Sequence, residues 1–415
     1  MKKWMALAAA LALGVSAGAA NAADKLKACW VYVGPVGDFG YSYQHDVGRK
    51  AVDKALGDKV ETVFLENVAE GPDAERAIER LAREGCKIIF TTSFGFMDPT
   101  IKVAAKYPDI KFEHATGYKK ADNVGIYNAR FYEGRYVMGQ IAAKMSKTGT
   151  AGYIVSFPIP EVVMGINAFM LGAQSVNPDF KVKIIWVNSW YDPGKEADAA
   201  KVLLGQGADI LVQHTDSTAP LQEAEKAGKL GFGQSSDMIK FAPKSQLTSN
   251  TDDWDPYYIA RVQAVLDGTW KSDDTWGGMK DGMVVLSPFT NMPDDVKKMA
   301  EDTVAKIKSG EFHPFTGPNF STAKDYPIQT RLGWGDVVRT TTEPQAPGQG
   351  YTPSYTLMSG LAASLFSARA RLAAGGADPA TTPGIDPSSI HPTACRSTWP
   401  ATRWPIPATH SRQAA

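Results

Sequence analysis

The stretch ACWVYV, at residues 28–33, is a short run of apolar and aromatic residues, and the loop DFGYSYQ follows it at residues 38–44. The second half of the chain repeats this order, with VKIIWV at residues 182–187 leading directly into NSWYD at residues 188–192. Short, mostly apolar runs of this kind are typical of buried strands. Ligands of open α/β sheets bind just beyond the carboxyl ends of the strands. The two loops therefore predict one site with two aromatic faces, which favours a binding protein over an enzyme.

Apolar runs and amphipathic segments alternate from Lys25 to about His114. The segment AERAIERLAR at residues 74–83 places Ala74, Ile78 and Leu81 on one face, which predicts a helix. Such alternation implies right-handed βαβ units and a mostly parallel sheet. The expected strands are residues 28–33, 60–66, 87–92 and 110–115.

The same alternation returns in the second half of the chain. Its expected strands are residues 152–157, 183–187 and 209–214, and its expected helices are residues 162–176, 196–204 and 220–227. A helix at residues 253–270 and a strand at residues 283–286 come last. Two series of similar length predict two lobes rather than one large domain. The predicted fold class is α/β, with two Rossmann-like three-layer lobes and a ligand cleft between them.

The first 23 residues resemble a cleavable signal peptide. A basic start, Met1 to Lys3, precedes an apolar run at residues 5–15 and small residues at 17–23. A membrane span needs about 20 apolar residues, so this run is too short for one. Because no cysteine follows the run, a lipid-anchored form is not expected. The sequence predicts export, with a bacterial periplasm as the destination.

The chain contains three cysteines, Cys29, Cys86 and Cys395. An exported domain held together by disulfides would show an even and denser set. We therefore expect Cys29 and Cys86 to be buried small hydrophobic residues. The formal net charge is zero, with acids and bases interleaved, so no basic stripe for nucleic acid is expected and the partner should be small.

Residues 330–415 differ from the rest of the chain. They contain no lysine, and alanine, proline, threonine, serine and arginine dominate them. Two interpretations fit this composition: a disordered secreted tail, or a shifted reading frame that was never selected to fold. No function is assigned to this segment.

Several segments, taken in order, resemble one known family. They are DFGYS at residues 38–42, FGF at 94–96, YPD at 107–109, EGRYVMG at 133–139, PIPEV at 158–162, NAFMLGA at 167–173 and WYDP at 190–193. This order resembles the basic-membrane-protein (BMP) family of substrate-binding proteins for ABC transporters, which includes purine nucleoside receptors. The resemblance runs from about Lys25 to Gly317.

The resemblance implies a type I periplasmic-binding-protein fold with crossovers near Arg130, Ser249 and Lys280. The N-terminal lobe would then comprise residues 24–129 and 250–279, and the C-terminal lobe residues 130–249 and 280–329. It also implies a purine held between two rings. Tyr41 stands where the family places a stacking aromatic residue, and Trp190 stands at the second aromatic position.

The predicted ligand-binding residues come partly from strand ends and partly from family position. They are Asp38, Phe39, Tyr41, Ser93, Phe94, Phe96, Asn167, Trp190, Asp237 and Lys280. For Tyr41 and Trp190 the alternative is ordinary core packing. For Asp38 and Asp237 the alternative to ligand binding is a helix N-cap.

One departure from the family bears on the ligand. Members that hold a nucleoside commonly carry an acid where this chain has Ser235, within GQSSDM at residues 233–238. This favours a free base such as adenine over a nucleoside. A sugar or furanose-type solute is the alternative ligand, since sugar sites also stack aromatic rings.

Enzyme classes find little support in the sequence. The six histidines show no metal-ligand spacing, and His214, Asp216 and Ser217 are triad residue types, but their adjacency in the sequence is not triad geometry. The one Gly-x-Ser-x-Gly match, GVSAG at residues 14–18, lies within the expected signal peptide, and no dinucleotide motif occurs. We therefore expect no catalysis, cofactor or metal, and rank a periplasmic nucleoside hydrolase below a receptor. The predicted protein is a monomeric periplasmic receptor that closes on a purine and delivers it to an ABC permease.

Overall fold

The computed structural model describes residues 25–315 and two short strands, Val338–Thr341 (β13) and Ser354–Leu357 (β14). The predicted signal peptide, and residues 330–415 apart from these two strands, lie outside the described residues.

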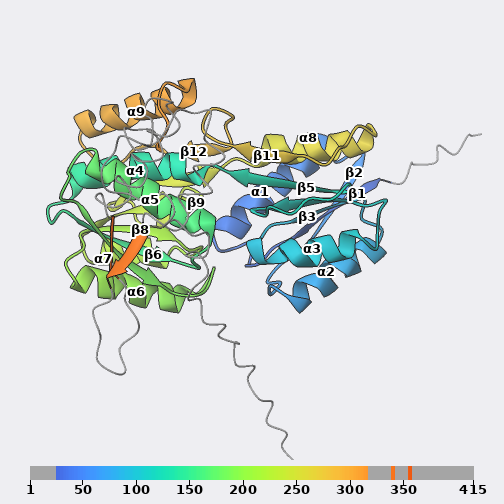
Figure 1. Cartoon of the computed structure of the whole chain (residues 1–415), viewed down its shortest axis with the longest axis horizontal. Helices are drawn as coiled ribbons and strands as arrows, with labels where there is room; N and C mark the ends of the chain where they lie inside the picture. The colour runs from blue at the N-terminus through green and yellow to red at the C-terminus, as the bar shows by residue number, and fades with distance from the viewer. Residues whose placement is uncertain (1–24, 316–337, 342–353, 358–415) are drawn as a thin grey trace, which may run out of the picture. The chain divides into compact units, whose positions relative to one another are not determined.

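The first sheet has six strands in the order β11-β5-β4-β3-β1-β2, and all its pairs are parallel. Helices cover both faces of this sheet, with α1 and α8 on one and α2 and α3 on the other (Figure 1). The strands are β1 (Leu26–Val31), β2 (Val60–Leu65), β3 (Ile88–Thr91), β4 (Lys111–Ala115), β5 (Val124–Ala129) and β11 (Asp274–Gly277). The helices are α1 (Tyr41–Leu56), α2 (Pro72–Arg83), η1 (Phe94–Phe96), α3 (Met97–Ala104) and α8 (Asp255–Leu266).

The apolar run of strand β1 is buried on both faces of the first sheet. Trp30 packs in the cluster beneath α1 and α8, stacked on Phe90 with ring centroids 4.6 Å apart. Its neighbours Cys29 and Val31 pack in the cluster beneath α2 and α3. Because successive side chains of a strand point to opposite faces, a strand covered on both faces needs apolar residues throughout.

The second sheet has the order β12-β10-β9-β8-β6-β7-β14-β13. Its central strands are parallel, whereas β12, β14 and β13 pair antiparallel with their neighbours. The strands are β6 (Thr150–Val155), β7 (Lys181–Trp186), β8 (Ile210–His214), β9 (Leu230–Ser235), β10 (Gln246–Asp252) and β12 (Val284–Leu286), with β13 and β14 as above. The helices are α4 (Phe131–Met145), α5 (Pro160–Gln174), α6 (Pro193–Gly205), α7 (Ala219–Lys226), η2 (Ile239–Phe241) and α9 (Asp294–Ser309).

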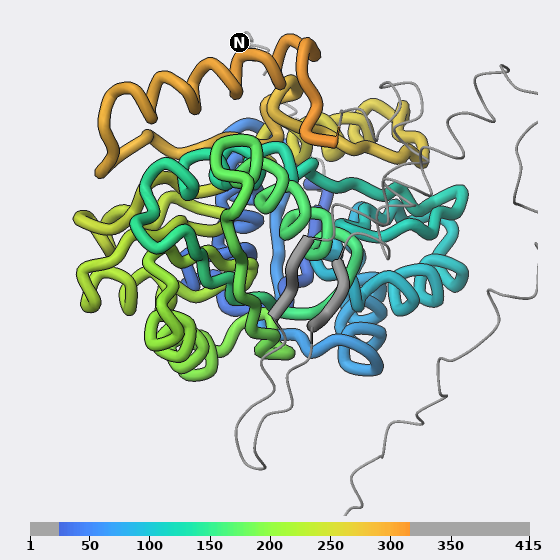
Figure 2. Tube along the Cα trace, turned by 60° about the vertical axis from the view of Figure 1, so that its left-hand side comes forward, coloured from blue at the N-terminus to red at the C-terminus, as the bar shows by residue number. Residues whose placement is uncertain are grey.

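Helix α4 packs against both α5 and α9 (Figure 2), while α6 and α7 cover the opposite face of the second sheet (Figure 1). Two glycines allow the close approach of α4 and α5. A Cβ atom at Gly139 would lie 2.0 Å from the carbonyl oxygen of Phe169, and one at Gly172 would lie 2.0 Å from that of Tyr136. Any larger residue at either position would push the helices apart.

The chain passes between the two sheets three times. It leaves the first sheet at Arg130, returns after Asp252, and leaves again between Gly277 and Val284. Ser249 lies inside β10, so the middle crossover falls slightly later than the expected position. The exact bounds of the two lobes as domains stay a prediction.

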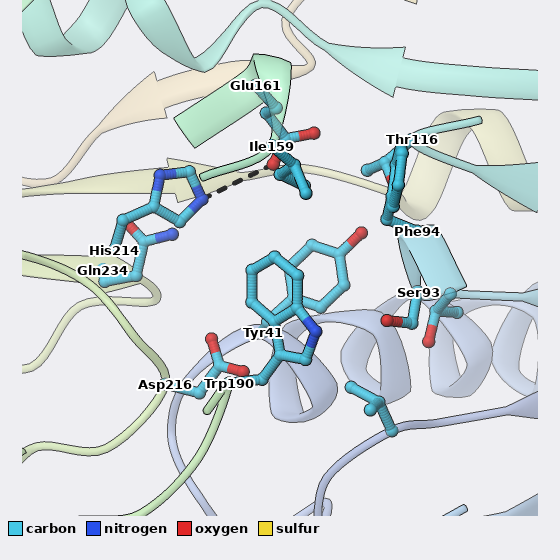
Figure 3. Close-up of a pocket in the computed structure, with 12 residues that line it drawn as sticks. Tyr41, Ser93, Phe94, Thr116, Ile159, Glu161, Trp190, His214, Asp216 and Gln234 are labelled. Atoms are coloured by element: carbon cyan, nitrogen blue, oxygen red, sulfur yellow. Dashed lines mark ion pairs between the residues drawn. The ribbon is translucent and has the colours of Figure 1, made fainter. Parts of the chain in front are cut away.

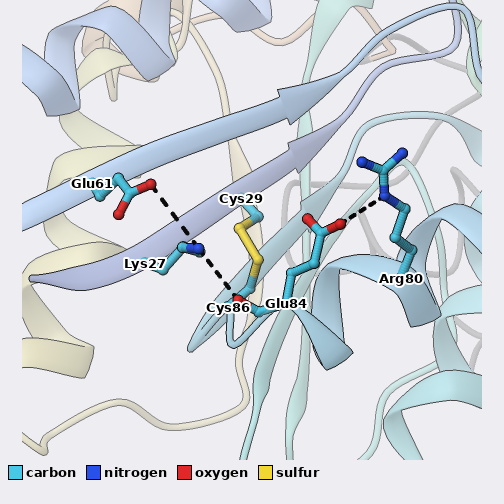
Figure 4. The surroundings of a disulfide bond; sticks show 6 residues. All are labelled: Lys27, Cys29, Glu61, Arg80, Glu84 and Cys86. Atoms are coloured by element: carbon cyan, nitrogen blue, oxygen red, sulfur yellow. Dashed lines mark hydrogen bonds and ion pairs between the residues drawn. A yellow bond between two sulfur atoms is a disulfide. The ribbon is translucent and has the colours of Figure 1, made fainter.

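Cys29 and Cys86 form a disulfide bond, so the prediction that they are separate hydrophobic residues is wrong (Figure 4). Strand β1 pairs with β3, and Cys86 lies two residues before β3, so the two Cα atoms lie 6.1 Å apart. This is within the usual range for a disulfide. Both residues are fully buried. Strands β1 and β3 are neighbours because of the order of strands in the sheet. The spacing of the cysteines in the sequence does not reveal this order.

Candidate ligand-binding site

A cavity lies beyond the carboxyl ends of strands from both sheets (Figure 3). It contains about 340 Å³ of space not filled by atoms, part of it open to solvent. Its lining residues follow β1, β3 and β4 of the first sheet and β6 and β7 of the second, or lie at the carboxyl ends of β8 and β9. They are Val33, Tyr41, Thr92, Ser93, Phe94, Thr116, Ile159, Glu161, Trp190, His214, Asp216 and Gln234.

Two aromatic rings border this cavity from different sheets. Tyr41 is the first residue of α1, and Trp190 lies in the loop between β7 and α6. In Figure 3 the two rings overlap in the line of sight, yet within the described part of the chain neither ring contacts the other. Tyr41 instead meets His45 edge-on at 4.3 Å, and Trp190 lies 5.2 Å from Phe157. Both rings are half-buried and contribute a face to the cavity.

Glu161 and His214 form a pair at the wall of the cavity. The Nε2 atom of His214 lies 3.4 Å from Oε1 of Glu161. Burial lowers the pKa of His214, although the Glu161 carboxylate acts in the opposite direction. The imidazole is therefore neutral near pH 7. Within the described residues, Oε2 of Glu161 and Nδ1 of His214 have no hydrogen-bond partner.

Asp216 adds a second carboxyl group to the lining. It is almost fully buried, and burial, followed by repulsion from Asp38 and Glu196, raises its pKa well above the usual range. Its Oδ2 atom has no partner among the described residues. The cavity thus presents unmatched oxygen atoms from two acidic residues, and such atoms gain most from N–H or O–H donors of a ligand.

Gln234 is held by groups behind the cavity wall. Its Oε1 atom accepts a hydrogen bond from Nη2 of the buried Arg135, and its Nε2 donates to Oγ of Ser235 at 3.2 Å. Ser235 is fully buried and is not part of the lining. The residue that departs from the family pattern therefore supports Gln234.

Four of the predicted residues line the cavity, namely Tyr41, Ser93, Phe94 and Trp190. Asp38 lies just outside, where its Oδ1 accepts hydrogen bonds from the backbone N–H groups of Gly40 (2.8 Å) and Tyr43 (3.2 Å). Asp38 thus binds the backbone at the start of α1, although the N-cap position itself is Gly40. The role of these residues in binding stays a prediction.

The other five predicted residues lie away from the lining. Phe39 stacks on Tyr43 with ring centroids 4.7 Å apart, and Phe96 is buried in the core beside α2 and α3. Asn167 is buried within α5. Asp237 is exposed and accepts a hydrogen bond from Gln246 at 2.6 Å, and Lys280 is exposed.

Several lining residues were not predicted, above all Glu161, His214, Asp216 and Gln234. His214 ends β8 and Asp216 follows it, so the rule that ligands bind beyond the carboxyl ends of strands could have identified both. Glu161 lies in the segment PIPEV, which the family resemblance had already marked. From the sequence, His214 and Asp216 were instead considered only as members of a possible catalytic triad. Ser217, the third member of that set, donates its hydroxyl to Glu196 at 2.7 Å.

The sequence model of one family matches residues 25–313, and its description is "ABC transporter substrate-binding protein PnrA-like", the Bmp family. The chain belongs to this family. Membership implies a small-molecule ligand and a membrane permease as partner, and it places the protein among substrate-binding proteins that act on the outer side of the membrane.

Two relatives and one solved structure resemble this Bmp-family chain. A purine-binding protein of Brucella abortus is 71% identical over 301 residues, covering 72% of this chain and 86% of the relative. A protein of Haloferax volcanii named for glucose binding in an ABC transporter is 39% identical over 309 residues, covering 74% and 78%. A solute-binding protein of an ABC transporter system from Aeropyrum pernix superposes with a TM-score of 0.63 at 21% identity, covering 74% and 98%. The fold is that of type I periplasmic binding proteins.

No three or more histidine, cysteine, aspartate or glutamate residues in the described part of the chain are grouped so that they could hold a metal ion. No described helix has the length and apolarity needed to cross a membrane.

Proposed function

We propose that this Bmp-family protein captures a purine, as an adenine-type base or a nucleoside, between Tyr41 and Trp190. The observation that supports this most strongly is the pairing of two aromatic faces, one from each sheet, across a single cavity. A base stacked on an aromatic side chain gains about 1–3 kcal/mol. Two such faces suit a flat ligand better than a globular one.

The polar lining supports a ligand rich in hydrogen-bond donors. Glu161 and Asp216 offer unmatched oxygens, and the ring N–H and exocyclic amine of adenine are donors. The hydroxyl groups of a ribose are also donors. Ser235, in place of the acid that nucleoside binders commonly carry, bonds with Gln234 and does not line the cavity. This favours a free base over a nucleoside.

Two relatives support different ligands. The Brucella abortus relative, at 71% identity, is named for purine binding, which supports the purine proposal. The Haloferax volcanii relative, at 39% identity, is named for glucose binding, and carboxylates can accept hydrogen bonds from sugar hydroxyls. A sugar is therefore the second candidate ligand.

The proposed mechanism is hinge closure in the periplasm by a monomer that performs no catalysis. A ligand that touches both lobes only when they are closed shifts the equilibrium towards the closed form. The permease would then recognise the closed form. A hydrolytic role has less support, because Ser217 bonds with Glu196 rather than with His214.

Mass spectrometry of small molecules released by denaturing the purified protein tests the proposal. We expect a purine base, accompanied by ultraviolet absorbance that the protein loses on denaturation. A released hexose would support the second candidate and contradict the first. Incubation with inosine and adenosine, followed by chromatography, tests for turnover, and we expect both nucleosides to remain intact.

A further inference from the structure

Glu70 joins the two halves of the candidate site without lining it. It lies in the loop between β2 and α2, and its Oε1 atom accepts three hydrogen bonds. The donors are the Ser93 hydroxyl (2.5 Å), the Gly95 backbone N–H (3.0 Å) and the Trp190 indole N–H (3.2 Å). Ser93 and Trp190 line the cavity, whereas Glu70 and Gly95 do not.

These bonds connect loops that belong to different sheets. Glu70, Ser93 and Gly95 follow strands β2 and β3 of the first sheet, and Trp190 follows β7 of the second. The Trp190–Glu70 bond is therefore a contact between the lobes, made by the ring proposed to stack on the ligand. When the lobes separate, this bond must break.

The surroundings of Glu70 are shaped for a carboxylate. A Cβ atom added to Gly95 would lie 2.3 Å from the Glu70 Cδ atom, so the carboxylate takes this position because residue 95 has no side chain. A carboxylate has only acceptors, and hydrogen bonds to a charged acceptor are stronger than those between neutral groups. One carboxylate oxygen can therefore hold the three donors together.

The indole bond also fixes the direction of the ring. Trp190 is half-buried, and its described ring contact is with Phe157. The bond from Nε1 to Glu70 restrains the side-chain rotation that this contact alone leaves open. An aromatic ring that this bond holds in place whenever the lobes are closed loses less conformational entropy on binding.

We propose that Glu70 is a positioning residue that sets the orientation of Trp190 and stabilises the closed arrangement of the lobes. It strengthens binding through Trp190 and has no contact with the ligand. This inference rests on the proposed function in one respect, that a ligand stacks on Trp190. The bond itself does not depend on the identity of the ligand.

A double-mutant cycle tests the proposal, with adenine as the probe in calorimetry. Trp190→Phe keeps an aromatic face and removes the indole donor, while Glu70→Ala removes the acceptor. We expect each variant to weaken affinity by about tenfold, the range for a hydrogen bond to a charged group, mostly through faster dissociation. The double variant should bind adenine no more weakly than whichever single variant binds it more weakly. Glu70→Gln, which keeps an acceptor oxygen, should lose less than Glu70→Ala.

Ser236→Ala provides the matched control. The Ser236 hydroxyl donates to the backbone carbonyl of Phe39, which is a contact between the lobes that does not involve Trp190. The loss of binding free energy for adenine in Ser236→Ala should add to the loss in Trp190→Phe. If the effects of Glu70→Ala and Trp190→Phe also add, Glu70 does not act through Trp190 and the proposal is overturned.

A second readout needs no ligand. In protein labelled with ¹⁵N-tryptophan, the Trp190 indole N–H signal is identified by its absence from Trp190→Phe. We expect slower exchange of this proton with water in the wild type than in Glu70→Ala, because the ligand-free protein also samples the closed form in which the bond is made. Equal exchange in the two proteins would overturn the proposal. If the wild type shows protection but binds no purine, the proposed function fails while the positioning bond stands.

Discussion

Trp190 makes two contacts of different kinds at the residue scale. Its ring borders the cavity, and its indole N–H binds Glu70. We expect Trp190→Ala to weaken adenine binding by about tenfold or more, since base stacking alone contributes about 1–3 kcal/mol. The fold should remain intact, because the side chain is half-buried rather than part of the core.

Calorimetry and thermal unfolding of this variant check both parts of the prediction. Tyr118→Ala is a suitable control, because Tyr118 is 63% exposed and does not line the cavity. Its affinity for adenine should equal that of the wild type. An unchanged affinity in Trp190→Ala would remove Trp190 from the site.

Asp38 makes the stability of the protein depend on pH. Burial raises its pKa to about 7, although the backbone N–H groups of Gly40 and Tyr43 lower it, and the carboxylate of Glu196 raises it further. Asp216 faces the same region and its pKa is also raised. A carboxyl group whose pKa is higher in the folded than in the unfolded state stabilises the fold most below about pH 4. This contribution is lost as the pH rises through about 7.

Asp38→Asn isolates this contribution, because the amide does not ionise and keeps an oxygen acceptor for the same backbone N–H groups. Relative to the wild type, the variant should gain stability between pH 5 and pH 8, by up to about 4 kcal/mol since one pKa unit corresponds to about 1.36 kcal/mol. Denaturant unfolding at several pH values measures the difference. A difference that stays constant with pH would contradict the raised pKa.

The site was predictable from the sequence where a residue type and a strand end coincided. Tyr41, Ser93, Phe94 and Trp190 all follow apolar runs, and all four line the cavity. Glu161 and Asp216 were overlooked because carboxylates are common on protein surfaces, and only the fold brings these two to one buried wall. Asp237 and Lys280 were also predicted to bind the ligand, but both side chains are exposed, and the sequence does not reveal this exposure.

At the scale of elements, the strongly apolar strands were predicted within a few residues, as β1, β2, β3, β4, β6, β7, β8 and β12 show. They are recognisable because both faces of each sheet are covered. Strand β5 (VGIYNA) was not predicted, since glycine and asparagine interrupt its apolar pattern. Helix α9 was also missed, because only Val296, Ala300 and Ile307 among its residues are buried.

The disulfide between Cys29 and Cys86 gives a prediction about β1 and β3. The bond joins residues 57 positions apart, so it restricts the unfolded chain. Replacing both cysteines with alanine should lower the free energy of unfolding by about 2–4 kcal/mol. Adenine binding should change little, because Cys86 precedes β3 whereas the cavity lies beyond its carboxyl end.

Denaturant unfolding and calorimetry of the double variant provide the check. Reduction of the wild type with dithiothreitol should lower its free energy of unfolding by a similar amount. Equal stability of the wild type and the variant would show that the bond does not form in solution.

At the scale of the whole molecule, closure depends on the segments that cross between the sheets. Arg130 donates to Glu133 at 2.6 Å and forms an ion pair with Asp281 at 2.9 Å. Glu133 in turn accepts a hydrogen bond from the backbone of Met279 at 2.6 Å. These contacts tie the first crossover to the last one.

Arg130→Ala should therefore loosen the crossovers and weaken adenine binding by about two- to fivefold, since partly exposed ion pairs contribute little each. The cavity is not lined by Arg130, Glu133 or Asp281. Lys298→Ala, which breaks the exposed pair with Asp302 on α9, serves as a control and should leave affinity unchanged. Equal affinities of Arg130→Ala and the wild type would show that the network does not influence closure.

The two-sheet architecture was predictable because two βα series follow one another in the sequence, and the family match covers the same region. The sequence did not reveal the pairing of β14 with β7, since β14 lies in the segment 330–415, where no strand was expected.

The most direct test of the central claim is calorimetric titration of the ligand-stripped protein with adenine, adenosine and glucose. We expect saturable binding of adenine, weaker binding of adenosine, and no heat from glucose. Binding of glucose with no response to either purine would contradict the purine assignment and leave a sugar receptor of the same fold.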